Sequence, residues 1–282
     1  MTRSGLIGVD ELLQVVGEQA EVTLLDVRYR MGGGPSGVTA FAAGHVPGAA
    51  YVDLDRALAA PAGDGGRGRH PLPEVADFQA AMREVGVRDD RPVVVYDDWA
   101  GHAAARCWWL LRYHGHQDVR VLDGGWSAWQ EAGGPIETGR DGQDGRGGRT
   151  SGTFTARPGA LPAVDVGTVR QAAVVVDARA AERYHGEVEP IDPVAGHVPG
   201  AVNVPTSRNL DERGRFREPA ELAAVYAEVG AVPGADVAVY CGSGVTAAHD
   251  VLALELAGVR AALYPGSWSE WVADPGRPVE RS

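Results

Sequence analysis

Cys241 stands where a thiol can be made reactive. Residues 237–240 form an apolar run typical of a buried strand. The loop Gly242-Ser243-Gly244 follows, and a helical pattern begins near residue 245. Backbone N–H groups and the helix dipole favour an anion at such a helix N-terminus and lower the pKa of a thiol. A core cysteine does not need two nearby glycines, so we expect Cys241 to be a nucleophile rather than a buried apolar residue.

The composition restricts the class of protein. The chain has 282 residues, of which 44% are hydrophobic and 23% charged, as expected for a soluble protein of one large domain or two smaller ones. The net charge of −12 argues against nucleic acid or an anionic membrane as the main partner. The N-terminal sequence lacks the apolar core of a signal peptide, and no apolar run has the length of a membrane span.

Cysteine and histidine usage restricts the chemistry further. Only Cys107 and Cys241 are present, which excludes a disulfide framework or a cysteine-rich metal site. We expect no metal and no cofactor, since His114 and His116 form no ligand set with nearby cysteines or carboxylates. A reducing cytoplasm, in which a thiol stays reactive, is the predicted location.

Four short motifs occur twice, in the same order, and divide the chain into two copies of one unit. The matched segments are 24–28 with 175–179, 43–49 with 195–201, 93–96 with 237–240, and 125–129 with 267–271. In this alignment Asp97 stands opposite Cys241. The first copy therefore retains the scaffold without the thiol.

Each copy alternates short apolar strands with longer helical stretches, which predicts an α/β domain with a largely parallel sheet. In the second copy we expect strands at 174–177, 237–240 and 261–264, and helices at 220–229 and 246–257. The polar, glycine-rich segment 139–152 reads as a flexible linker. The predicted organisation is a non-catalytic domain at 1–138, the linker at 139–152 and a catalytic domain at 153–282.

Taken together, these motifs resemble the rhodanese-like sulfurtransferases over nearly the whole chain. The Asp-x-Arg strand ends, the paired Gly-His-Val-Pro-Gly-Ala segments and the cysteine loop carry the resemblance. It implies two tandem rhodanese-like domains, each a mostly parallel sheet flanked by helices, with an inactive first domain. The loop at 241–246 is similar to that of 3-mercaptopyruvate sulfurtransferases, whereas thiosulfate sulfurtransferases typically carry basic residues there.

The resemblance implies a persulfide mechanism. The Cys241 thiolate takes sulfur from a small donor and passes it to cyanide or to a thiol acceptor such as thioredoxin. Amides from Gly242, Gly244, Val245 and Thr246 would hold the anionic sulfur. An uncharged loop suits a donor with one carboxylate and a ketone, to which the Ser243 hydroxyl can donate a hydrogen bond.

Three further residues gain roles from the resemblance alone. Asp55 and His70 would reach Ser243 from the first domain and form a relay that assists proton transfer; the alternative for His70 is a surface histidine beside a proline turn. Arg183 matches an arginine that binds the substrate carboxylate, and its alternative is an exposed surface arginine. The family's second arginine has no counterpart in segment 188–193.

Other functions remain as alternatives. A cysteine-dependent phosphatase needs an arginine six positions after its cysteine, where this chain has Ala247, and a larger loop. A thiosulfate sulfurtransferase is the second hypothesis, and a non-catalytic sulfur-binding or sensor module is the third. His45 and His197 recur in both copies, so we interpret them as structural, as are the paired Asp-x-Arg strand ends.

Overall fold

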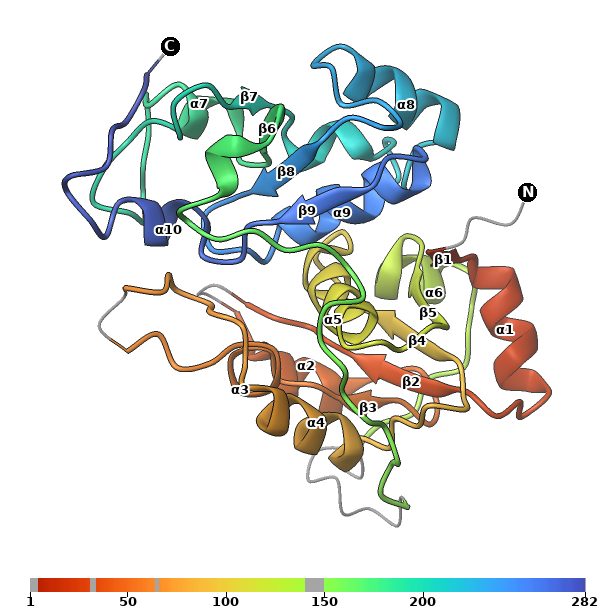
Figure 1. Cartoon of the computed structure of the whole chain (residues 1–282). Coiled ribbons are helices and arrows are strands. Elements are labelled where there is room, and N and C mark those ends of the chain that lie inside the picture. Colours follow the sequence, from red (N-terminus) through yellow and green to blue (C-terminus); the bar gives the residue numbers. More distant parts are fainter. Residues whose placement is uncertain (1–4, 31–33, 64–65, 140–149, 282) are drawn as a thin grey trace. The chain divides into compact units, whose positions relative to one another are not determined.

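The structure, a computed structural model, describes residues 5–30, 34–63, 66–139 and 150–281. The chain divides into two compact units, Met1–Ala59 with Pro73–Ala160 and Ala60–Leu72 with Leu161–Ser282. Each unit contains one parallel sheet flanked by helices, which confirms the predicted fold class (Figure 1). Most of the predicted linker, residues 140–149, lies outside the described residues.

The first unit is built on a five-stranded sheet. Its strand order is β1-β5-β4-β2-β3, and all neighbouring strands are parallel. The strands are β1 (Leu6–Ile7), β2 (Thr23–Asp26), β3 (Ala50–Tyr51), β4 (Val93–Tyr96) and β5 (Val119–Leu122). The helices are α1 (Val9–Gly17), α2 (Gly37–Ala43), α3 (Leu54–Ala57), α4 (Val75–Glu84), α5 (His102–Tyr113) and α6 (Gly125–Glu131).

The second unit repeats this plan with four strands. Their order is β7-β6-β8-β9, again all parallel. The strands are β6 (Val174–Asp177), β7 (Val202–Asn203), β8 (Val237–Tyr240) and β9 (Ala261–Leu263). The α-helices are α7 (Ala181–Tyr184), α8 (Pro219–Ala227), α9 (Ala247–Leu256) and α10 (Ser267–Trp271), with short 3₁₀ helices at Val169–Gln171 and Thr206–Asn209.

Local sequence explains why these elements form where they do. All four residues of β4 and of β8 are buried, as expected for central strands covered on both faces. Helix α8 begins with Pro219 and a capping box between Glu218 and Glu221, which satisfies its first N–H groups. The central strands thus end, and the following helices begin, close to the positions expected from the sequence.

The two units share the same strand-end clamp. Arg28 donates through Nη2 to Asp26 and to the carbonyl oxygen of Gly44, both at 2.6 Å. Arg179 makes the matching contacts with Asp177 and the carbonyl oxygen of Gly196, also at 2.6 Å. The repeated Asp-x-Arg pairs are therefore structural, as predicted. They fix the segment after β2 or β6 to the Gly-His turn.

Several residues that could have been functional have structural roles instead, in hydrogen bonds to the backbone or in the core. His45 Nδ1 lies 2.9 Å from the carbonyl oxygen of Phe41, and His197 Nδ1 lies 2.8 Å from that of Tyr184, which confirms the structural interpretation of both histidines. Trp268 is fully buried in the core of the second unit. Cys107 is equally buried in α5, and burial raises the pKa of its thiol well above the ordinary range.

The segment Ala60–Leu72 precedes the predicted linker but packs with the second unit. The Arg69 backbone N–H donates to Ser269 Oγ at 3.0 Å. Gly68 has φ +84°, and a Cβ at this position would lie 2.5 Å from the carbonyl oxygen of Gly266. The close backbone approach therefore requires glycine at position 68. These contacts place the side chains of Arg69 and His70 against other residues of the second unit.

Candidate active site

Cys241 follows β8 directly, and its backbone is fixed from both sides. The Cys241 N–H donates to Ser267 Oγ at 3.1 Å, and its carbonyl oxygen accepts from the Trp268 N–H at 2.9 Å. The side chain is buried, with only 2% of the residue exposed. Helix α9 begins at Ala247, after a loop of five residues. The thiol therefore lies at the carboxyl end of a central parallel strand, the usual ligand-binding edge of such a sheet.

The loop aims a backbone donor at the sulfur. The Gly244 N–H donates to Cys241 Sγ at 3.1 Å. Gly244 has φ +78°, and a Cβ here would meet the carbonyl oxygen of Pro265 at 2.2 Å. Both the backbone conformation and the close approach require glycine. The predicted cradle residues Val245 and Thr246 complete the turn into α9, with Val245 buried.

Ser243 and His70 come together within the second unit. His70 Nδ1 lies 2.8 Å from Ser243 Oγ, although 173 positions separate the two residues in the chain. His70 belongs to Ala60–Leu72, the segment that packs with this unit. Asp55 lies in α3 of the first unit, where its backbone N–H donates to the side chain of Asp53 at 3.0 Å. The role predicted for Asp55 stays a prediction.

Arg183 lies in α7 and is held by two acidic residues. It donates to Glu189 through Nη2 at 2.6 Å and through Nε at 3.2 Å, and Nη2 lies 3.4 Å from Asp192. The Arg183 side chain is 17% exposed, whereas the two carboxylates are each 4% exposed. Arg183 is thus a largely buried, ion-paired residue rather than a free surface arginine. Glu189 and Asp192 occupy the segment in which the sequence offered no second arginine.

Arg69 was not identified from the sequence. It forms an ion pair with Asp192, and its guanidinium approaches Gly242 beside Cys241. A Cβ added to Gly242 would lie 2.9 Å from Arg69 Nη2 and 3.5 Å from Arg183 Nη1. The available signal was the position of Arg69 immediately before the candidate histidine His70.

The pKa values of the two carboxylates of this cluster shift in opposite directions. Burial raises the pKa of Asp192 above its ordinary value, and the nearby charge of Glu189 adds to this effect. Burial would also raise the pKa of Glu189, but hydrogen bonds from Arg183 and from two backbone N–H groups lower it below its ordinary value. Glu189 is therefore the firmly ionised partner of the arginines.

The matching loop of the first unit is filled by its own carboxylate. Asp97 Oδ1 accepts hydrogen bonds from the backbone N–H groups of Trp99 and Gly101, both at 2.9 Å. Its Oδ2 accepts from the Ala104 N–H at 2.8 Å. Asp97 is fully buried. The first unit thus keeps a loop that binds an anion, and the anion is part of the chain.

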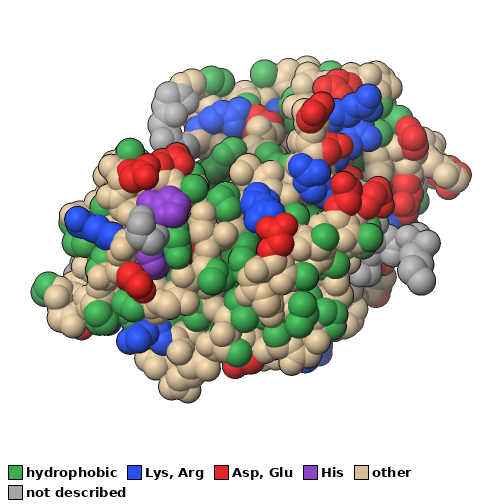
Figure 2. Space-filling view, turned by 90° about the horizontal axis from the view of Figure 1, so that it is seen from above, with side chains coloured by type: hydrophobic (Ala, Val, Ile, Leu, Met, Phe, Trp, Pro, Cys, Tyr) green, Lys and Arg blue, Asp and Glu red, His purple; other side chains and the backbone are tan. Residues whose placement is uncertain are grey.

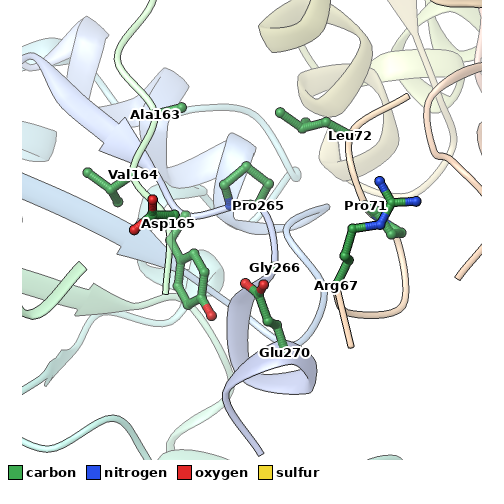
Figure 3. A pocket seen from close by; sticks show the side chains of 10 residues that line it. Arg67, Pro71, Leu72, Ala163, Val164, Asp165, Pro265, Gly266 and Glu270 are labelled. Carbon is green, nitrogen blue, oxygen red and sulfur yellow. The ribbon is translucent and has the colours of Figure 1, made fainter. Parts of the chain in front are cut away.

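A pocket of about 350 Å³ lies within the second unit, and one of its lining residues, Pro265, has its carbonyl oxygen close to Gly244 of the Cys241 loop. Figure 3 shows Arg67 and Leu72 on one side of it and Asp165 and Glu270 on the other. Tyr264 also lines the pocket, and burial, together with the charge of Glu270, raises the pKa of its hydroxyl.

The described residues show no group of three or more histidine, cysteine or acidic side chains arranged to hold a metal ion. Within the same residues, no helix is long and apolar enough to cross a membrane. On the face seen in Figure 2, basic side chains lie beside acidic ones, so the charge there is mixed.

Comparison with known proteins identifies the family. The model of the rhodanese-like domain matches residues 8–132 and 166–274. A Mycobacterium tuberculosis protein named for thiosulfate sulfurtransferase activity, SseB, is 45% identical over 98% of this chain and 96% of its own length. A Pseudomonas aeruginosa protein named for 3-mercaptopyruvate sulfurtransferase activity is 40% identical over 99% of both chains.

The solved structures agree with this assignment. The crystal structure of SseA from Escherichia coli, described as a 3-mercaptopyruvate sulfotransferase with a rhodanese fold, superposes with a TM-score of 0.79 at 33% identity. The match covers 94% of this chain and 99% of that one. The Mycobacterium tuberculosis and Pseudomonas aeruginosa relatives match over nearly the whole chain and are both named as sulfurtransferases, although their names give different sulfur donors. Together with the fold and the repeated motifs, they show that this chain belongs to the rhodanese-like domain family and is a two-domain sulfurtransferase.

Proposed function

We propose that this sulfurtransferase takes sulfur from 3-mercaptopyruvate, with Cys241 as the sulfur carrier in a catalytic second domain. The observation that carries the proposal is the contact of 2.8 Å between His70 Nδ1 and Ser243 Oγ, two residues from the thiol in an uncharged loop. Such a loop suits a donor with a single carboxylate and a ketone. A dianion such as thiosulfate would favour basic side chains in the loop.

The reaction begins with attack of the Cys241 thiolate on the donor sulfur. A sulfur–sulfur bond forms and the carbon–sulfur bond of the donor breaks, leaving its electron pair on the carbon as pyruvate enolate. Protonation of the enolate at its oxygen gives the enol, which tautomerises to pyruvate by moving that proton to the carbon. In the second half, cyanide or a thiol attacks the outer sulfur, the sulfur–sulfur bond breaks and the thiolate of Cys241 returns. The Gly244 N–H, which donates to Sγ, stabilises the anionic sulfur in both halves.

Ser243 and His70 assist the first half of this reaction. Negative charge develops on the ketone oxygen as the enolate forms, and the Ser243 hydroxyl can donate to it. His70 then orients that hydroxyl and supplies the proton through it. Asp55 is proposed as the residue that orients His70, by the family resemblance. Gly242 leaves room beside Cys241 for the donor.

Thiosulfate is the second candidate donor, because the Mycobacterium tuberculosis relative is named for that activity. For the acceptor, sulfurtransferase activity implies cyanide or a thiol, and we propose thioredoxin as the physiological thiol. A reducing, cytoplasmic location is proposed on the same ground, since Cys241 must remain a thiol to react.

A comparison of kcat/KM for 3-mercaptopyruvate and thiosulfate, with cyanide as the acceptor of both, tests the donor. We expect a higher kcat/KM for 3-mercaptopyruvate. Faster turnover of thiosulfate would overturn the proposal. Cys241→Ser is the control and should transfer no sulfur from either donor, because a hydroxyl cannot form a persulfide; the Cys107→Ser variant should retain turnover. Mass spectrometry of the wild-type protein after donor addition should show one added sulfur atom.

A further inference from the structure

Two arginine side chains leave unused donors at the same point beside Cys241. A Cβ on Gly242 would lie 2.9 Å from Arg69 Nη2 and 3.5 Å from Arg183 Nη1. Among the described residues, neither of these two nitrogens has a hydrogen-bond partner. A guanidinium carries five N–H donors in a planar fork that matches a carboxylate. The two free nitrogens therefore face the space over Gly242.

Other nitrogens of the two guanidinium groups hold both arginines in this position. Arg69 uses Nη1 for Asp192, and Arg183 uses Nε and Nη2 for Glu189, with Nη2 also 3.4 Å from Asp192. Asp192 thus links the two arginines. It is itself held in place by its backbone N–H, which donates to Glu189 Oε1 at 3.1 Å. Fixed side chains lose little conformational entropy when a ligand binds.

The charges of this cluster are balanced. Arg179 also pairs with Glu189, at 3.3 Å, and with Asp177. The cluster therefore contains three arginines and three carboxylates: Arg69, Arg179, Arg183, Asp177, Glu189 and Asp192. A balanced cluster offers directed N–H donors without a strong excess of positive charge. Such a site favours a singly charged, planar carboxylate over a compact dianion.

We infer that Arg69 determines specificity by binding the carboxylate of the sulfur donor together with Arg183, and that Asp192 is the residue that positions Arg69. The inference rests on the proposed use of 3-mercaptopyruvate. In this chain the second arginine comes from Ala60–Leu72, whereas the segment after Arg183 supplies the acidic residue that holds it. No bond is made or broken in this step, because the arginines act only in binding.

The test compares 3-mercaptopyruvate with mercaptoacetone, which keeps the thiol and the ketone but lacks the carboxylate. In the full-length protein, Arg69→Gln should lower kcat/KM for 3-mercaptopyruvate about 10- to 100-fold, mainly through KM, because a charge-assisted hydrogen bond is lost. The same variant should leave kcat/KM for mercaptoacetone within about two-fold. Arg69→Lys should recover only part of the loss, since an ammonium cannot reproduce the planar fork.

Arg213→Gln is the matched control, because it removes an exposed arginine from the same unit that does not line the site. It should leave KM for 3-mercaptopyruvate unchanged. Asp192→Asn should raise that KM, and in the Arg69→Gln background it should add little, because both changes disrupt one interaction. An equal loss with both donors in Arg69→Gln would assign Arg69 a structural role and overturn the inference.

The wild-type protein separates this inference from the donor proposal. Absence of 3-mercaptopyruvate turnover by the wild type would overturn both. Turnover by the wild type with an unchanged KM in Arg69→Gln would overturn the role of Arg69 alone. Thermal unfolding of each variant shows whether the fold is intact.

Discussion

His70 Nδ1 lies 2.8 Å from Ser243 Oγ, so the imidazole and the hydroxyl are already positioned for proton transfer two residues from the candidate nucleophile. The two candidate donors differ in whether their leaving group needs the proton that this contact can supply. Pyruvate leaves as a basic enolate that needs a proton. Sulfite, the leaving group from thiosulfate, is a stable anion that does not.

Ser243→Ala and His70→Asn should therefore slow transfer from 3-mercaptopyruvate more than transfer from thiosulfate. A loss of about 100-fold in kcat for 3-mercaptopyruvate is expected from the removal of general acid assistance. Steady-state kinetics with both donors measures the difference. Ser207→Ala, which changes an exposed serine in the same unit, is the control. Equal losses with the two donors would contradict the proton-transfer role.

Asp97 should contribute to the stability of the first unit, because its carboxylate accepts three backbone N–H groups. Asp97→Ala leaves these donors without their acceptor and should lower the free energy of unfolding by roughly 2–5 kcal/mol. Asp98→Ala removes only a partly exposed ion pair with Arg30 and should cost under about 1 kcal/mol. Urea unfolding of both variants checks the prediction, which fails if their midpoints are the same.

Asp250 gives the stability a definite pH dependence. It is fully buried in α9, and burial raises the pKa of its carboxyl well above the ordinary value of 3.8, although Asn209 donates to its Oδ1 at 2.6 Å. The folded protein thus keeps a proton that the unfolded chain releases. Stability contributed by this proton is present below pH 3.8 and is lost as the pH rises toward the pKa of the folded state.

Asp250→Asn removes this linkage and keeps an amide oxygen that can accept from Asn209. The variant should match the wild type in stability near pH 3 and exceed it near pH 7, by about 1.4 kcal/mol for each pKa unit of elevation. Thermal unfolding across this pH range measures the difference. A constant difference at all pH values would show that Asp250 is ionised in the folded protein.

The sequence by itself determined the tandem repeat, the parallel α/β sheets and the position of Cys241 at a strand end. These features depend on local patterns: apolar runs, glycines in turns and motifs that occur twice. The same patterns located Ser243 and the cradle glycines, because neighbours in a loop are necessarily neighbours in space. The family resemblance added His70 and Arg183 as candidates.

Only the tertiary structure decided which distant residues meet around the thiol. The contact between Arg69 and Asp192 joins residues 123 positions apart, and no local pattern encodes it. The same holds for the packing of Ala60–Leu72 with the second unit, which depends on a close backbone approach of Gly68 to Gly266. Periodicity and spacing report the conformation of a segment, whereas side-chain pairing across the fold depends on how the segments pack.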